Sequence, residues 1–183
     1  ITENEIEESK NYLADKIKSK RIVSLILGGP NKYYSFNRKQ LLKIFNKIKS
    51  AFVSKGYQVV IIPSIRTPKK CIELAIKEMG ACGHIVKYVD KQAYLSAYAW
   101  ANYVVVTCDS TSMISEAATS GKPVYIAHMK TKRNNYRFRK FFKLFNDMGI
   151  TRDLASTKDE PWTYDKYNEA ERIASKIKNK IKK

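Results

Sequence analysis

Short apolar runs alternate with longer amphipathic segments along most of the chain. Five runs have the length of a strand, at residues 21–27, 58–62, 84–88, 103–107 and 124–128. The runs at 21–27, 58–62 and 103–107 are the most continuously apolar, which is typical of strands buried on both faces of a parallel sheet, and the run at 84–88 is the weakest. Between them, apolar residues recur at helical spacing at 37–55, 69–79, 94–100, 112–119 and 134–147. This alternation predicts an α/β fold, a Rossmann-like doubly wound parallel sheet of five or six strands.

Two further amphipathic segments lie at the ends of the chain. Residues 2–19 begin acidic and end basic, which suits the helix dipole and predicts a leading helix within 1–20. Residues 165–181 predict a closing helix. The length of 183 residues fits one ordinary domain, so we expect a single Rossmann-like domain over 1–183.

The net charge of +18 suggests an acidic partner, either nucleic acid, anionic lipid or a phosphorylated ligand. Lysine is spread over most predicted helices, so a generally basic surface without a dedicated partner is the alternative. No apolar run approaches the ~20 residues that cross a bilayer, and no signal peptide is recognisable.

The chain has three cysteines, Cys71, Cys82 and Cys108, and two histidines, His84 and His128. An odd cysteine count without CxxC spacing argues against a disulfide framework, and the histidines do not complete a familiar zinc pattern. We therefore expect a reducing compartment and no metal site.

Two loops directly follow buried strands and carry chemistry suited to an anion. Gly28-Gly29-Pro30 ends the first run, where glycines let a backbone approach a ligand and its amides cradle a phosphate. Asp109, Ser110, Thr111 and Ser112 follow the fourth run at the start of a helix, with Glu116 one turn further on. The alternatives are a tight turn that needs positive φ and an ordinary capped helix.

A third loop, at 63–68, supplies Arg66, a cation that can pair with a phosphate or a carboxylate. In open parallel sheets, ligands bind at the carboxyl ends of strands, where all three loops lie. Together they predict a phosphate-bearing ligand, either a nucleotide or a nucleotide sugar. Catalysis has less support, because Cys108 and Asp109 have no histidine nearby in sequence.

The segment at 130–144 interleaves basic and aromatic residues, as nucleic-acid or membrane-surface segments do. The spacing of Phe138, Phe141, Phe142 and Phe145 instead favours a core-facing stripe with lysines in water.

Five stretches resemble the mitochondrial fission family called elongated mitochondria and its bacterial relatives. They read LILGGPNKYYSF at 25–36, PSIRTP at 63–68, YLSAYAWANYVVVTCDSTSMISEAATSGKPVYI at 94–126, FRKFFKLFNDMGITR at 138–152 and EPWTYDKYNEAERIA at 160–174. The sequence departs from the expected pattern at Ile65, at Tyr33-Tyr34 and at Asn102. None of these departures falls within 109–116.

That family resembles the C-terminal, nucleotide-binding domain of GT-B glycosyltransferases. The resemblance implies that Ser110, Thr111 and Ser112 contact a diphosphate, that Glu116 approaches a ribose, and that Gly28, Gly29 and Arg66 line the same cleft. It also implies a partner N-terminal domain that this chain does not contain. We expect no required metal or cofactor, because the helix dipole and Arg66 can offset the charge of a diphosphate.

The resemblance leaves two functions open: a glycosyltransferase-like domain that binds a nucleotide sugar, and a non-catalytic scaffold for membrane-fission or membrane-surface assemblies. For the scaffold, 134–147 would be the working surface. Charge alone leaves nonspecific nucleic-acid binding as a third, less favoured function. A bacterial cytoplasmic location is expected, with peripheral binding at the inner membrane as the alternative.

Overall fold

A computed structural model describes residues 1–157 and 160–165 and places six strands in one parallel sheet, in the order β3-β2-β1-β4-β5-β6. The strands are β1 (Ile22–Leu27), β2 (Gln58–Pro63), β3 (Gly83–Ile85), β4 (Tyr103–Thr107), β5 (Val124–Ala127) and β6 (Thr151–Asp153). This is the strand order of dinucleotide-binding sheets: successive strands are added on one side of β1 up to β3 and then on its other side from β4 onward, so the order reverses between β1 and β4.

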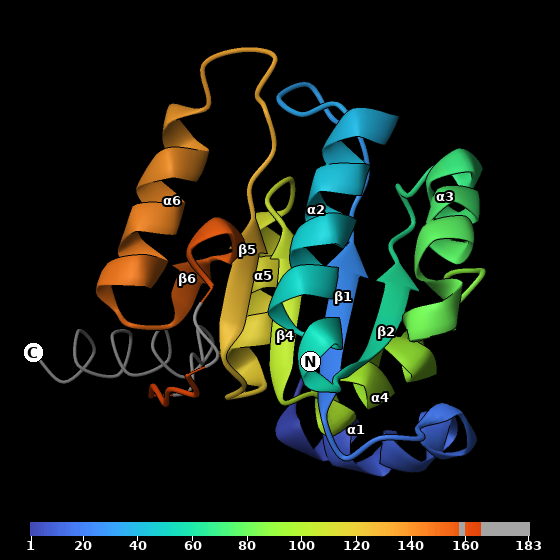
Figure 1. The fold of residues 1–183 in the computed structure, drawn as a ribbon. Helices are drawn as coiled ribbons and strands as arrows, with labels where there is room; N and C mark the ends of the chain where they lie inside the picture. Colours follow the sequence, from blue (N-terminus) through green and yellow to red (C-terminus); the bar gives the residue numbers. More distant parts are fainter. Residues whose placement is uncertain (158–159, 166–183) are drawn as a thin grey trace, which may run out of the picture.

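Helices lie on both sides of the sheet, with α2 in front of it and α5 behind it in Figure 1. The described α-helices are α1 (Glu3–Glu8), α2 (Arg38–Ala51), α3 (Lys69–Met79), α4 (Lys91–Trp100), α5 (Thr111–Thr119) and α6 (Tyr136–Asp147). The prediction of a doubly wound parallel sheet is therefore confirmed.

The centre of the sheet is apolar on both faces, as the continuous runs predicted. Every residue of β1 and of β4 is buried. Ile26 of β1 pairs with Val106 of β4, so these two strands end at the same level. The loops that follow them therefore meet at the carboxyl edge of the sheet.

The leading helix predicted over 1–20 is wrong in its extent. Helix α1 ends at Glu8, and a 3-10 helix, η1, continues over Lys10–Lys16. Side chains of α4 capture backbone groups of this segment. Leu13 N–H donates to Ser96 Oγ at 3.2 Å, and Lys10 O accepts from Trp100 Nε1 at 2.8 Å. Packing against α4 thus replaces the regular i to i−4 bonds that the periodicity alone predicted.

Two strand predictions also change. The third strand was expected over 84–88, but β3 ends at Ile85, and Tyr88 and Val89 are exposed. β6 was not predicted, because it has three residues of which Arg152 and Asp153 are exposed. The closing helix predicted at 165–181 lies, apart from its first residue, outside the described residues.

Candidate functional site

The loops after β1 and β4 are joined directly by hydrogen bonds. Gly28 N–H donates to Thr107 Oγ1 at 2.8 Å, and Gly29 N–H donates to the Asp109 carboxylate at 3.2 Å. Thr107 Oγ1 in turn donates to Asp109 Oδ1 at 2.7 Å. The sequence predicted that the amides of the glycine turn bind an anionic ligand. In the structure, these amides are already bonded to Thr107 and Asp109.

The loop after β2 joins the same cluster through Arg66. Its guanidinium donates to Asp109 Oδ2 at 2.7 Å and to the Gly29 carbonyl at 3.2 Å. The Asp109 side chain is 0% exposed, whereas that of Arg66 is 36% exposed. Burial raises the pKa of the Asp109 carboxyl, and the effect outweighs the opposing hydrogen bond from Thr107 and the charge of Arg66.

The two glycines are required by close approach and not by backbone conformation. A Cβ at Gly28 would lie 2.2 Å from Asp109 Oδ1, and one at Gly29 would lie 1.9 Å from the Arg66 carbonyl oxygen. Neither glycine has positive φ. The sequence allowed the glycines to be explained by a tight turn that needs positive φ, and that explanation is wrong.

Helix α5 begins at this cluster, and Ser110 is its N-cap. The Ser110 hydroxyl accepts from Met113 N–H at 3.4 Å. The N–H groups of Thr111 and Ser112, in the same first turn, bond to no group within residues 1–157 and 160–165, as expected for the start of a helix. Ser112 is exposed and Thr111 half-buried, so this turn remains accessible to a ligand.

Glu116 lies further along α5 and faces α4. Its carboxylate accepts from Tyr94 Oη at 2.5 Å, and the Tyr98 hydroxyl donates to Tyr94 Oη at 2.8 Å. Burial raises the pKa of the Tyr94 phenol, with the Glu116 carboxylate adding to the shift. Tyr94 is therefore a neutral donor that orients one carboxylate oxygen of Glu116.

Sequence reasoning missed three polar residues that hold these loops together. Thr107 bridges the glycine turn and Asp109, as described above. Thr67 Oγ1 lies 2.6 Å from the Leu27 carbonyl and 2.8 Å from the Gly28 carbonyl, and Asn31 Nδ2 donates to Asp109 O at 2.9 Å. The signal for Thr107 was a hydroxyl at the end of an otherwise apolar strand; Thr67 and Asn31 gave none.

The groups considered for nucleophilic catalysis are not arranged for it. Cys108 is buried, its sulfur accepts from Met129 N–H at 3.3 Å, and burial raises the pKa of its thiol to about 12. The His128 ring packs edge-on against Phe142 with centroids 5.0 Å apart. Within the part of the chain that the structure describes, no three His, Cys, Asp or Glu side chains could hold a metal ion.

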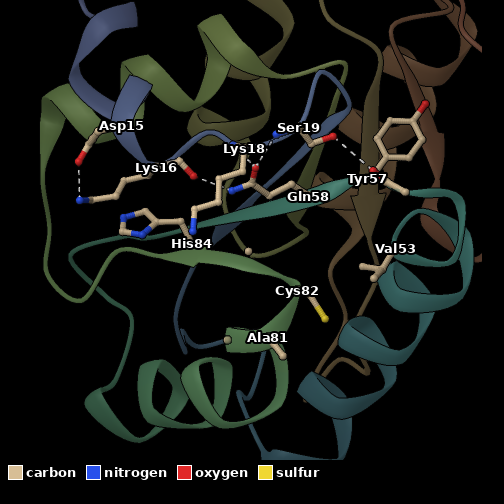
Figure 2. A pocket seen from close by; sticks show the side chains of 13 residues that line it. Asp15, Lys16, Lys18, Ser19, Val53, Tyr57, Gln58, Ala81, Cys82 and His84 are labelled. Carbon is tan, nitrogen blue, oxygen red and sulfur yellow. Dashed lines mark hydrogen bonds and ion pairs between the residues drawn. The ribbon is translucent and has the colours of Figure 1, made fainter.

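A hollow of about 640 Å³ lies at the opposite edge of the sheet, where β2 and β3 begin. Figure 2 shows Lys16, Lys18 and His84 on one side of it, with Gln58 between them and Tyr57. Gln58 is engaged by the chain itself, since its amide accepts from Lys18 N–H at 2.7 Å and donates to Lys16 O at 2.7 Å. This hollow lies between the N-terminal segment and the starts of β2 and β3, far from the loops that follow β1 and β4.

The fold is shared with a nucleotide-sugar enzyme. A protein from Listeria monocytogenes assigned as a UDP-N-acetylglucosamine 2-epimerase superposes with a TM-score of 0.54 at 14% sequence identity, over 99% of this chain and 48% of that one. Together with the strand order, this confirms a Rossmann-like domain of the GT-B type. None of the described helices is both long enough and apolar enough to cross a membrane.

Two curated proteins are similar over nearly nine-tenths of the chain. The uncharacterised protein RP120 of Rickettsia prowazekii (strain Madrid E) is 29% identical over 170 residues, which are 89% of this chain and 48% of that protein. The mitochondrial fission protein ELM1 of Arabidopsis thaliana is 27% identical over 169 residues, 88% of this chain and 38% of that protein. The chain thus spans less than half the length of either relative. The model of one family matches residues 1–181, and the chain accordingly belongs to the mitochondrial fission ELM1 family.

Proposed function

We propose that this chain is the donor-binding domain of a glycosyltransferase-like protein and that it binds the diphosphate of a nucleotide sugar at the first turn of α5. The observation that carries the proposal is the pair of N–H groups at Thr111 and Ser112, at the carboxyl edge of the sheet, that have no hydrogen-bond partner among the described residues. A helix start presents free amides and the positive end of the helix dipole together, which suits a phosphate. The name of the Listeria epimerase supports this ligand class.

The side chains around this turn fit the same ligand. Ser112 and Thr111 carry hydroxyls next to the free amides, and the guanidinium of Arg66 lies one loop away with 36% of its side chain exposed. The Gly28 and Gly29 amides take no part, because Thr107 and Asp109 occupy them. The helix dipole and Arg66 offset the charge of a diphosphate, so the proposed site requires no metal or other cofactor.

Glu116 is the residue we assign to the ribose. One of its carboxylate oxygens is bonded to Tyr94, and the other bonds to no group among the described residues. A free carboxylate oxygen can accept from a vicinal diol, and Tyr94 fixes its orientation. We assign no catalytic residue within this chain, and a transfer reaction remains part of the proposal for the longer protein.

Thermal unfolding of the chain with UDP, GDP, ADP, CMP and their sugars tests the proposal. A ligand at ~100 times its dissociation constant adds roughly 2.7 kcal/mol, which raises the unfolding temperature by roughly 5–11 °C. The decisive variant is Ser112→Glu, because an acid at this helix position favours the helix dipole yet repels a phosphate. We expect it to leave the free protein as stable as wild type and to remove the nucleotide effect.

The matched control is Asn4→Glu, which adds the same charge at the equivalent position of α1, at the edge of the sheet where the strands begin (Figure 1). It should keep the full nucleotide effect. The proposal fails if no nucleotide stabilises the wild-type chain, or if Ser112→Glu responds to nucleotide as strongly as Asn4→Glu does.

A further inference from the structure

One stretch of the sequence carries a concentrated positive charge. Residues 117–146 contain no aspartate or glutamate and eight basic residues, Lys122, Lys130, Lys132, Arg133, Arg137, Arg139, Lys140 and Lys143. The stretch includes β5, the loop after it and nearly all of α6. No carboxylate within it can neutralise these cations locally.

Helix α6 divides this charge from its apolar residues. Phe142 and Phe145 are buried against the sheet, as the core-stripe interpretation of the sequence predicted. The opposite side of α6, together with Arg133 three residues before the helix begins, presents a row of exposed side chains three or four positions apart. We call this row the basic face; it consists of Arg133, Tyr136, Arg137, Lys140, Lys143 and Leu144.

The basic face mixes cations with exposed aromatic and aliphatic side chains. Tyr136 is 64% exposed and Leu144 is 47% exposed, although both are large and apolar enough to be buried elsewhere. Asp147, at the end of α6, forms an ion pair with Lys143 at 2.9 Å. Arg133, Arg137 and Lys140 form no ion pair within the described residues.

The other end of the molecule carries no such excess of positive charge, because residues 1–21 hold five acidic and five basic residues. Helix α1 carries Glu3, Glu5, Glu7 and Glu8. In Figure 1, α1 lies where the strands begin, whereas the loop before α6 lies where they end. A strongly positive segment at one end and a neutral N-terminal segment at the other favour an orientation with α6 and the carboxyl edge toward a negatively charged surface.

We propose that the basic face docks the domain on an anionic phospholipid bilayer. Basic side chains attract the phosphates of acidic lipids, while Tyr136 and Leu144 can insert at the level of the headgroups. Nucleic acid would use the cations but would not explain two exposed apolar side chains between them. Because no described helix could span the bilayer, the contact is interfacial.

Docking in this way places the candidate site beside the membrane. Thr131 forms a β-bridge with Tyr34, and Lys132 N–H donates to Tyr33 O at 2.7 Å. These bonds hold residues 131–132, just before the basic face, against the loop that begins with Gly28 and Gly29. The carboxyl edge would therefore open toward the lipid surface, within reach of a membrane-bound acceptor. The docking itself does not depend on nucleotide binding.

Co-sedimentation of the chain with vesicles tests the proposal. Vesicles of phosphatidylcholine alone are compared with vesicles that also contain one-third phosphatidylglycerol, at 50 and 300 mM NaCl. We expect binding to the anionic vesicles only, weaker in high salt. Each basic residue near such a surface raises the affinity for the vesicles about fivefold. The triple variant Arg137→Gln, Lys140→Gln, Lys143→Gln should therefore bind anionic vesicles about a hundredfold more weakly than wild type.

The matched control replaces three exposed lysines elsewhere, Lys43→Gln, Lys77→Gln and Lys87→Gln, and changes the net charge by the same amount. It should lose no more than a few-fold in vesicle affinity. Far-UV circular dichroism and the response to nucleotide should match wild type in both triple variants. If the control loses as much affinity as the α6 variant, the effect is one of net charge, and the proposal is overturned.

A second variant separates lipid from nucleic acid. Tyr136→Ser with Leu144→Ser keeps every cation and removes the apolar contribution, so it should weaken vesicle binding about tenfold and leave binding to a 30-base-pair DNA duplex unchanged. Absence of wild-type binding to anionic vesicles, or tighter binding to the duplex than to the vesicles, would overturn the proposal.

Discussion

Replacing Gly29 with alanine is the sharpest test of how the candidate site is built. A Cβ at this position would lie 1.9 Å from the carbonyl oxygen of Arg66, whereas ordinary contacts begin at 3.4 Å. The backbone of the Arg66 loop would have to retreat by about 1.5 Å, the difference between these two distances. Because Gly29 does not have positive φ, the conformation of the alanine itself is not strained.

Hydrogen bonds resist this retreat. Thr67 Oγ1 holds the loop to the carbonyls of Leu27 and Gly28, and Arg66 holds it to Asp109. The Thr67 hydroxyl has one proton to share between the two carbonyls, so its loss costs about 1 kcal/mol, and loss of the charged bond from Arg66 costs about 2 kcal/mol, which gives roughly 3 kcal/mol of destabilisation. For a chain of this length that lowers the unfolding temperature by roughly 6–12 °C.

The assay is thermal unfolding followed by circular dichroism, with Gly80→Ala as the control. A Cβ at Gly80 meets no atom within 4 Å, and its φ of −57° suits alanine. The control should match wild type or gain up to about 1 kcal/mol. Equal unfolding temperatures for the two alanine variants would refute the close approach between the β1 and β2 loops.

Two other predictions concern the start of α5. Ser110→Ala removes the N-cap and should cost about 1 kcal/mol, seen as a fall of roughly 2–4 °C in unfolding temperature; no fall would mean that the 3.4 Å cap bond contributes nothing. Asp109→Asn addresses pH. Because burial raises the pKa of Asp109 in the folded state above its unfolded value near 3.9, the folded protein holds more protons between those two pKa values. Stability from this group is present at low pH and is lost as the pH rises through the folded pKa. The stability of wild type relative to Asp109→Asn should therefore decline as the pH rises from the unfolded pKa near 3.9 through the raised folded pKa. A relative stability that increases over this range would mean that Arg66 dominates and that the pKa is lowered.

The arrangement of the sheet could be predicted because β1, β2 and β4 are continuously apolar, and such strands have to be buried on both faces. The loops that follow them had to share one edge, which brought Gly28, Arg66 and Asp109 together in the prediction as they are in the structure.

Other features depend on contacts that no local pattern reveals. The N-terminal segment has helical periodicity, yet Ser96 and Trp100, more than 80 residues away, capture its backbone and tighten it into η1. The β6 strand pairs through three residues, too few for any alternation to appear. The prediction that the amides of Gly28 and Gly29 bind a ligand failed for the same reason, because no local pattern shows that the Asp109 side chain points toward Gly29.

The position of Asp109 determines where an anion can approach this edge of the sheet. A phosphate that used the Gly29 amide would have to displace a fully buried carboxylate and would then lie against it as a like charge. At the first turn of α5, by contrast, the amides are free and the helix dipole attracts an anion. Arg66 is paired with Asp109, and part of its side chain remains exposed. The glycines, Thr107 and Asp109 therefore hold the three loops together, and the exposed first turn of α5 is the place where we propose that the ligand binds.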